Sequence, residues 1–367
     1  MFTSLRTMVI AGAVVALALP AAAQMTPAAG YTPPDDTPTI KVGATIFTDY
    51  TYQSAPDLTD ADGNVVSPSS FNVGRAYINI TGNISHLLAF RITPDIVRET
   101  GGTLGTGSSL AGSLTYRLKY AYAQVNLDDW MWKGTWTRLG MQQTPWVDFE
   151  EGIYRYRFQG TVFMDREGYL SSSDVGASFR TAFPGNYGDV HVGVYNGDNY
   201  NRADPNDQKG LEIRGTLRPL PRARYLRGLR LTGFYDADHY VRDAERRRGL
   251  FAVTYEHQYL NAAWQYDDVR DQTSVTKSPV DGKGWSFWAT PKTTKGFEAL
   301  LRYDHLEPND SSNSRRNRAI FGLAYWLPHQ GTVSSAFMLD YEQVENKGFD
   351  PSRPREERIA VHSLVNF

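Results

Sequence analysis

The chain ends in VHSLVNF (Val361–Phe367), where apolar and polar residues alternate before an aromatic carboxy terminus. Ile359, Val361 and Val365 fall on the same side of an extended strand as Phe367, because successive side chains of a strand point to opposite faces. One face of this strand is apolar, as a strand facing lipid must be. The stretch predicts a bacterial outer-membrane β-barrel whose last strand closes against its first, so that no backbone edge stays unpaired. Phe367 would be its barrel-assembly signal, with the barrel-assembly machinery and outer-membrane lipid as partners.

The first 23 residues have the pattern of a secretory signal peptide. Arg6 gives a basic start, the run from Met8 to Leu19 is apolar, and small residues precede Gln24. This run is shorter than the ~20 residues of a membrane-spanning helix, and no later stretch approaches that length. We expect residues 1–23 to be removed on export to the outer membrane, residues 24–38 to form a flexible periplasmic lead-in, and residues 39–367 to form the barrel.

The composition suits a large closed sheet. The 367 residues include 22 Tyr and 8 Trp, as aromatic girdles require, and the low mean hydropathy of -0.45 fits strands that alternate lipid-facing and lumen-facing residues. The absence of cysteine excludes a disulfide scaffold and Cys-ligated metals. A net charge of -2 gives no argument for nucleic-acid binding, and a solvated loop is the simpler interpretation of the basic run Arg246–Arg248. We predict no cofactor and no metal.

Alternation recurs along the chain. It begins with Ile40, Val42, Ala44 and Ile46 and continues in the segments around residues 76–80 and 88–92. Further strands are predicted at about residues 113–127, 134–142, 173–183, 187–196, 209–219, 227–238, 247–257, 259–269, 283–291, 294–306, 316–327, 330–343 and 355–367. The sequence therefore predicts an all-β, antiparallel transmembrane barrel of about sixteen strands, an even number as bacterial barrels have.

The connections between these strands alternate in length along almost the whole chain. Short ones, expected to be periplasmic turns, lie near residues 82–85, 184–188, 258–260 and 328–331. Long polar ones, expected to be extracellular loops, lie near residues 52–70, 97–112, 143–172, 197–208, 268–282, 306–315 and 344–355. A secreted sandwich or a soluble β-helix would also give many short strands, so this asymmetry favours the barrel.

The connection at 143–172 is unusually rich in aromatic residues for a solvated loop. We expect it to fold into the lumen as a constriction loop, because it carries enough apolar surface to pack against something. The alternative is a loop that covers the top of the barrel or contacts a neighbouring subunit. Its candidate functional residues are Trp146, Asp148, Glu150, Glu151, Arg155, Arg157 and Arg166.

Alternation also assigns charged residues to the pore, because Arg or Lys facing lipid near the midplane costs ~2–4 kcal/mol. The predicted basic pore-lining residues are Lys41, Arg75, Arg91, Arg117, Lys119, Arg138, Arg214, Arg230 and Arg302. The predicted acidic ones include Glu212, Asp236, Glu298 and Asp304. Such a lining favours small anions weakly. For any single charged residue, the alternative is that it forms an ion pair with an opposite charge and so supports the barrel wall.

Four segments resemble the porins of the phosphate-selective porin O and P family. RLGMQQTPWVDFEE (Arg138–Glu151) resembles that family's strand leading into its third loop, and DREGYLSSSDVGASF (Asp165–Phe179) resembles the return from it. VHVGVYNGDNYN (Val190–Asn201) and RGTLRPL (Arg214–Leu220) are similar to a strand end and to the following Arg-rich strand. Together the segments cover about a third of the chain, and they mark strand ends and turns more than chemistry.

The resemblance implies a sixteen-stranded barrel, a homotrimer, and passive diffusion of small hydrophilic solutes, commonly anions. Gln142 and Gln143 stand where the family often has Phe-Lys, and carboxylates outnumber arginines in the long loop. We therefore expect a general or weakly anion-preferring channel rather than strong phosphate selectivity.

The sequence leaves two other functions open. One is a structural or adhesive barrel with a blocked lumen, which would not conduct. The other is an outer-membrane hydrolase, which needs an activated nucleophile beside a base. The seven histidines lie in no motif with a serine and have no metal-ligand spacing, so the sequence argues against an enzyme.

Overall fold

The structure is a computed structural model that describes residues 36–99, 110–204, 206–329 and 331–367. The predicted signal peptide at 1–23 and most of the predicted lead-in at 24–38 lie outside the described residues. Within the described ranges, no helix is both long and apolar enough to cross a membrane.

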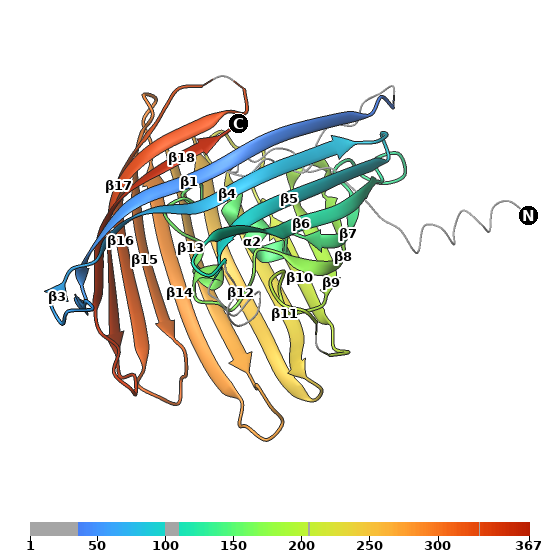
Figure 1. Cartoon of the computed structure of the whole chain (residues 1–367). Helices are drawn as coiled ribbons and strands as arrows, with labels where there is room; N and C mark the ends of the chain where they lie inside the picture. Colours follow the sequence, from blue (N-terminus) through green and yellow to red (C-terminus); the bar gives the residue numbers. More distant parts are fainter. Residues whose placement is uncertain (1–35, 100–109, 205, 330) are drawn as a thin grey trace, which may run out of the picture.

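Sixteen antiparallel strands form one closed barrel in which consecutive strands pair (Figure 1). The barrel strands are β1 (Thr39–Ala55), β4 (Ser69–Asn83), β5 (Leu88–Arg98), β6 (Leu114–Asn126), β7 (Trp136–Gln142), β8 (Asp174–Ala182), β9 (Gly188–Tyr195), β10 (Gly210–Leu217), β11 (Leu229–Val241), β12 (Ala244–His257), β13 (Leu260–Asp271), β14 (Val280–Pro291), β15 (Phe297–Glu307), β16 (Arg315–Trp326), β17 (Ser334–Lys347) and β18 (Glu356–Asn366). The connection from β1 to β4 holds a small hairpin of β2 (Leu58–Thr59) and β3 (Val65–Val66).

The last strand closes the barrel against the first, as predicted. β1 pairs with β18 from Thr45 opposite Asn366 to Ala55 opposite Glu357. The ladder reaches the final residue, because the Phe367 amide donates to the Ala44 carbonyl at 3.1 Å and the Ala44 amide donates to the Phe367 carbonyl at 3.0 Å. Every backbone group along this seam can then pair inside the sheet, which is what permits a sheet to sit in lipid.

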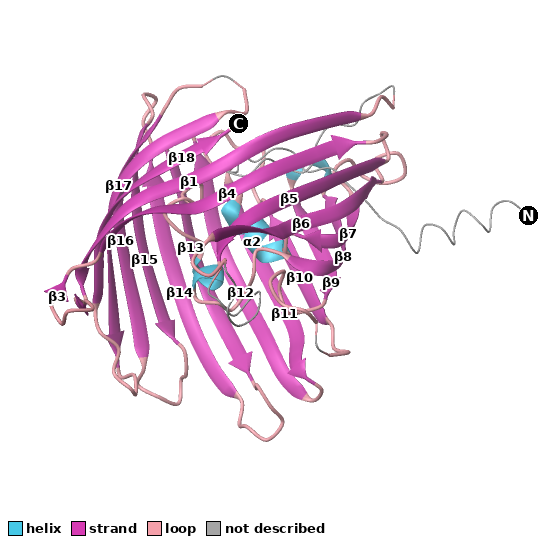
Figure 2. Cartoon of the chain, in the orientation of Figure 1, coloured by secondary structure: helices cyan, strands magenta, loops and turns pink. Residues whose placement is uncertain are grey.

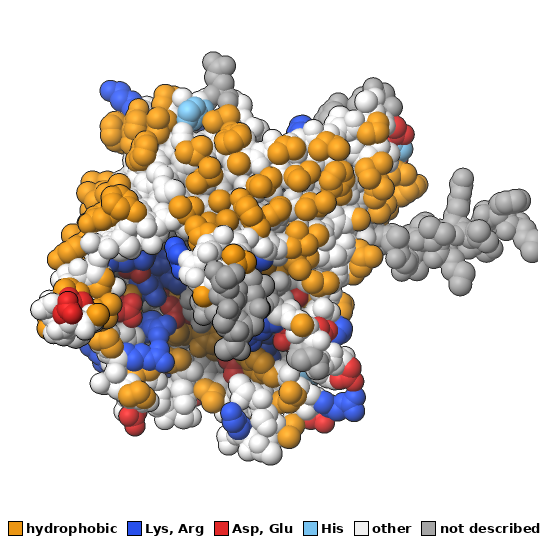
Figure 3. Space-filling view, in the orientation of Figure 1, with side chains coloured by type: hydrophobic (Ala, Val, Ile, Leu, Met, Phe, Trp, Pro, Cys, Tyr) orange, Lys and Arg blue, Asp and Glu red, His pale blue; other side chains and the backbone are white. Residues whose placement is uncertain are grey.

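The two faces of the strands differ as the alternation predicted. In β18, Ile359, Val361 and Val365 are exposed on the outer face, while Ala360 and Leu364 are buried on the inner face. Hydrophobic side chains cover the outer wall of β1, β4, β5 and β6 (Figure 3). On these strands, apolar side chains thus cover the outer face of the barrel.

The connections sort by barrel end in most cases, but the nine residues 127–135 between β6 and β7 lie on the rim of the short turns. Residues 218–228, between β10 and β11, form a long connection on the rim that carries the short turns and the carboxy terminus. On the opposite rim, β11 and β12 are joined by Arg242 and Asp243 alone. Asp243 has φ +65°, the left-handed conformation that two-residue hairpin turns use.

The prediction of a solvated loop at Arg246–Arg248 is wrong. All three residues belong to β12, which the tight turn allows to pair with β11 from Ala244 opposite Val241 to Tyr255 opposite Leu229. Arg248 is buried on the inner face and donates from Nη2 to Asp271 Oδ1 at 2.6 Å. A run of arginines fits a strand here because alternate members point into a polar lumen.

The turn between β4 and β5 is tied to residue 36. The His86 amide donates to Asp36 Oδ1 at 2.6 Å, and the His86 ring lies between two carboxylates, with Nδ1 at 2.5 Å from Asp36 and Nε2 at 3.0 Å from Asp129. The hydrogen bond to Asp36 raises the pKa of His86 above its usual value, with further contributions from the charges of both carboxylates. His86 thus joins Asp36, just before β1, to the β4–β5 turn and to the β6–β7 connection, where Asp129 lies.

We expect His86 to titrate above pH 6.5, and its pKa to fall toward 6.5 in Asp36→Asn. Because the folded pKa is raised, the stabilisation from protonated His86 is fully present below the unfolded pKa and is lost as pH rises through the folded pKa. The measurement is the histidine chemical shift of the refolded protein against pH by NMR. An equal His86 titration midpoint in the parent protein and in Asp36→Asn would contradict the role of Asp36 in raising this pKa.

Candidate functional site

The interior of the barrel is the candidate site. It is hollowed at the end that carries the long connections, and Lys and Arg side chains gather in this hollow (Figure 3). The structure places the predicted basic pore-lining residues on the inner face. Lys41 is exposed near a rim, Arg75 and Arg117 are partly exposed, and the rest are buried, namely Arg91, Lys119, Arg138, Arg214, Arg230 and Arg302.

Five of these residues form a basic sector on the adjacent strands β4 to β7: Arg75, Arg91, Arg117, Lys119 and Arg138. Asp95 lies among them, fully buried, with Oδ2 at 3.6 Å from Arg75 Nη1 and 3.9 Å from Arg117 Nη2. Both distances exceed hydrogen-bond length, and neither Asp95 oxygen has a hydrogen-bond partner in the described part of the chain. The basic sector therefore carries more positive than negative charge.

The other three cations of the basic sector are held by rings, hydroxyls and amides. Arg91 lies 4.5 Å from the centre of the Tyr120 ring and donates to Asn79 Oδ1 at 2.9 Å. Lys119 Nζ contacts the Tyr77 hydroxyl at 3.3 Å. Arg138 lies 3.8 Å from the Trp136 ring centre and donates to Gln124 at 3.0 Å. Rings and amides orient a cation without cancelling its charge.

Elsewhere on the wall, the predicted arginines are neutralised. Arg214 Nη2 lies 2.5 Å from Asp189 Oδ2, Arg302 Nη2 lies 2.8 Å from Asp304 Oδ2, and Arg230 is bound to Glu256. For these three residues the structure shows the self-neutralising alternative. The sequence alone could not separate them from the basic sector, because the partners depend on strand register.

The predicted acidic residues are all buried on the inner face. Glu212 and Asp236 lie directly opposite each other on β10 and β11. Glu298 accepts from Arg155 Nη1 at 3.0 Å and from the Tyr156 hydroxyl at 2.8 Å. Asp304 is bound by Arg302 and, at 2.7 Å, by the Ser286 hydroxyl.

The long connection from β7 to β8 lies inside the barrel (Figure 2). It holds two short helices, α2 (Pro145–Glu151) and α3 (Phe163–Arg166). Trp146, Tyr154 and Tyr156 are fully buried, and Tyr154 meets Trp288 of β14 with ring centres 5.2 Å apart. The aromatic residues that made this stretch unlike a solvated loop thus form its packing contacts.

The charged residues of this connection are mostly paired. Arg155 binds Glu298 of β15, Arg157 binds Glu151 within the connection, and Arg166 Nη1 lies 3.2 Å from Glu342 of β17. Glu150 accepts from the Trp146 ring at 3.2 Å, and its burial raises its pKa to about 8. Asp148 is exposed.

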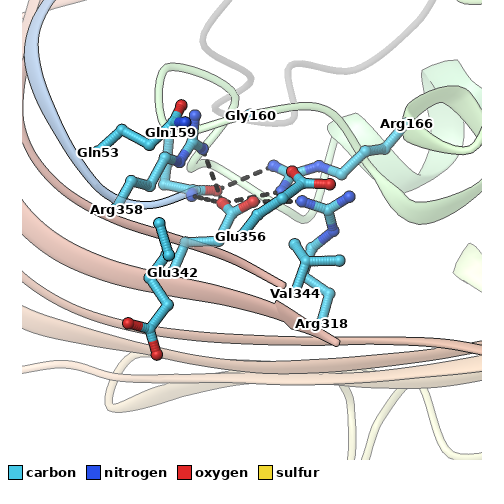
Figure 4. Close-up of a pocket in the computed structure, with 11 residues that line it drawn as sticks. Gln53, Gln159, Gly160, Arg166, Arg318, Glu342, Val344, Glu356 and Arg358 are labelled. Atoms are coloured by element: carbon cyan, nitrogen blue, oxygen red, sulfur yellow. Dashed lines mark hydrogen bonds and ion pairs between the residues drawn. The ribbon is translucent and has the colours of Figure 1, made fainter. Parts of the chain in front are cut away.

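Glu342 is the centre of the contact between this connection and the wall. It accepts from Arg166, Gln159, Arg318 and Arg358, beside a cavity of about 360 Å³ (Figure 4). The sequence did not predict Glu342, Arg318 and Arg358 as site residues. The signal was available for Glu342, which alternates with the lipid-facing Leu339 and Tyr341.

Histidine chemistry is limited in the described residues. His362 Nε2 lies 2.9 Å from Asp340 Oδ1 on the inner wall, and no serine hydroxyl is bonded to this pair within the described ranges. No group of three or more His, Asp or Glu residues in those ranges could hold a metal ion.

The chain resembles solved outer-membrane channels over nearly its whole length. The anion-selective porin from Comamonas acidovorans has a TM-score of 0.60 at 12% identity, covering 90% of this chain and 100% of that one. The outer-membrane channel DcaP of Acinetobacter baumannii has a TM-score of 0.57 at 12% identity, covering 92% and 100%. The trimer form of OmpT, an outer-membrane protein of Vibrio cholerae, has a TM-score of 0.58 at 12% identity, covering 90% and 99%.

No protein-family model and no curated protein matches the sequence. The chain therefore has the fold of the porins, a closed sixteen-stranded barrel with one long connection folded inside. Its narrower resemblance to the phosphate-selective porins O and P stays a prediction.

Proposed function

We propose that the protein is a bacterial outer-membrane porin that lets small hydrophilic solutes and ions diffuse passively, with a weak preference for anions. The observation that carries the proposal is the basic sector inside a porin barrel. Its five cations lie on one wall, and in the described residues only Arg75 and Arg117 of the five come within 4 Å of a carboxylate, at 3.6 and 3.9 Å. An uncancelled positive wall raises the local concentration of anions in a pore.

The connection at 143–172 would then act as the constriction. Its buried aromatic core and its ion pairs to β15 and β17 hold it inside the barrel, and Gln143 at its start accepts from Arg138 of the basic sector at 3.0 Å. Permeating ions would pass beside this connection and meet Arg75 and Arg117, the partly exposed members of the basic sector. The arginines on the rest of the wall, Arg214, Arg230 and Arg302, are paired with carboxylates. The basic sector would therefore set the preference for anions.

A homotrimer is part of the proposal. One structural neighbour, OmpT of Vibrio cholerae, is described in a trimer form. The apolar outer wall of the barrel offers a surface on which three copies would pack. Channel closures in groups of three would indicate this trimer.

The test is conductance of the refolded mature protein in planar bilayers under a KCl gradient. We expect stepwise open channels and a reversal potential with the sign of anion preference, with closures in groups of three for a trimer. Absence of conductance from a folded, heat-modifiable barrel would favour a structural or adhesive barrel with a blocked lumen. A cation-selective reversal potential would contradict the assigned role of the basic sector.

A further inference from the structure

The connection from β10 to β11 is out of place among its neighbours. It runs through the eleven residues RPLPRARYLRG (218–228), on a rim whose other connections range from two residues at 258–259 between β12 and β13 to nine at 127–135 between β6 and β7. It is folded, since the Arg227 amide donates to the Ala223 carbonyl at 3.0 Å and the Tyr255 hydroxyl donates to the Tyr225 carbonyl at 2.7 Å. A folded excursion at this rim needs a reason beyond joining two strands.

Its charge is all of one sign. Arg222, Arg224 and Arg227 are exposed, and the segment 218–228 contains no Asp or Glu. Within the described ranges, no carboxylate lies at ion-pair distance from these three arginines, whereas Arg242 on the opposite rim is paired with Asp207 at 2.7 Å. The three guanidinium groups therefore keep their charge for a partner outside the chain.

Apolar side chains accompany these arginines. Leu220, Tyr225 and Leu226 are 44%, 64% and 46% exposed. The connection continues onto the next turn along the rim, because the Arg218 amide donates to the carbonyl of Tyr187, which is itself exposed. One turn further, Trp132 is exposed and packs edge-on against Phe183, with ring centres 6.3 Å apart.

We propose that residues 218–228, with these neighbouring turns, form a docking surface for anionic phospholipid headgroups of the periplasmic leaflet. The segment lies at the ends of β10 and β11, where a membrane strand meets the headgroups, and exposed Tyr and Leu there suit the interface. Arginine binds phosphate by paired N–H donors, and phosphate oxygens would supply the negative charge that the protein does not. The proposal rests on the outer-membrane placement proposed above, but it does not require the channel to conduct.

The probe is phosphatidylglycerol against phosphatidylethanolamine. The mature protein is refolded in nanodiscs that hold mostly phosphatidylethanolamine with a minor fraction of phosphatidylglycerol, and lipids retained after transfer to detergent are counted by native mass spectrometry. We expect enrichment of phosphatidylglycerol that falls in Arg222→Ser/Arg224→Ser/Arg227→Ser, by roughly five-fold per arginine removed if each contributes about 1 kcal/mol.

Two matched variants make the result specific. The opposite-rim triple Arg242→Ser/Arg353→Ser/Arg355→Ser should keep the enrichment, and so should Arg222→Lys/Arg224→Lys/Arg227→Lys to a large extent, since it retains the charge. Heat modifiability in SDS gels reports folding, and the single Arg224→Ser serves if the triple does not fold. Absence of enrichment in the parent protein, or equal enrichment in the serine triple, would overturn the proposal whether or not the barrel conducts.

Discussion

Glu342→Gln is expected to destabilise the barrel by about 3 kcal/mol and to loosen the connection at 143–172. Removing one partner of a buried ion pair typically costs ~3–5 kcal/mol, because the opposite charge stays buried without compensation. Glu342 is 4% exposed and is shared by Arg166, Arg318 and Arg358. The lower end of the range applies, because Arg358 is 35% exposed and Arg318 keeps Glu167 as a second partner at 3.5 Å.

The loosening follows from the position of Arg166. This residue lies in α3, and its pairing with Glu342, together with the hydrogen bond from Gln159 Nε2 at 2.8 Å, attaches the connection to β17. Without the carboxylate, the connection loses charged contacts to this part of the wall. We therefore expect larger and noisier single-channel conductance as well as a lower urea midpoint in lipid vesicles, followed by tryptophan fluorescence.

A matched control lines the same cavity. Glu356→Gln removes an equal charge from an exposed side chain that has no hydrogen-bond or ion-pair partner among the described residues. Surface substitutions of this kind usually stay within about 0.5 kcal/mol. Equal urea midpoints for the two variants would show that the shared carboxylate does not hold the connection.

The fold was predictable because every strand of a membrane barrel alternates outward apolar residues with inward polar ones. The apolar face of Ile359, Val361 and Val365 has counterparts along the chain, and lipid enforces the alternation at each strand. The prediction of a solvated loop at Arg246–Arg248 was wrong because it was based on the run of charge and not on the alternation of faces. Arg246 and Arg248 point inward from β12, so a polar lumen, rather than open solvent, surrounds this basic run.

The site was predictable in part. Alternation selects the inner face, and that is where the structure places the predicted pore-lining residues. It does not select partners, because Arg166 meets Glu342 only through the path of the long connection across the barrel. Likewise, Arg214 is cancelled by Asp189 while Arg138 rests on Trp136, although both are inward arginines on strands. Partner identity depends on register and on tertiary packing, which periodicity does not encode.

Arg75→Glu/Arg117→Glu is expected to move the channel toward cations, by roughly ten-fold in the ratio of chloride to potassium permeability, or ~1.4 kcal/mol. These two side chains are 26% and 24% exposed, so permeating ions can approach them, and they face Asp95 at distances too long for hydrogen bonds. Reversal potentials in planar bilayers under a KCl gradient give the ratio directly.

The neutral variant Arg75→Gln/Arg117→Gln separates charge from shape. It removes two positive charges where the double reversal changes the sign of both, so its shift should be about half as large on a free-energy scale. It also leaves Asp95 without the crowding of two added carboxylates, which guards against a folding defect in the reversed variant. Lys41→Gln is the matched control, because Lys41 is an exposed inner-face residue near the rim and its partner on β4, Thr81, lies six residues along the strand from Arg75. A reversal potential that is unchanged in both basic-sector variants, or that moves equally in Lys41→Gln, would remove the basic sector as the source of selectivity.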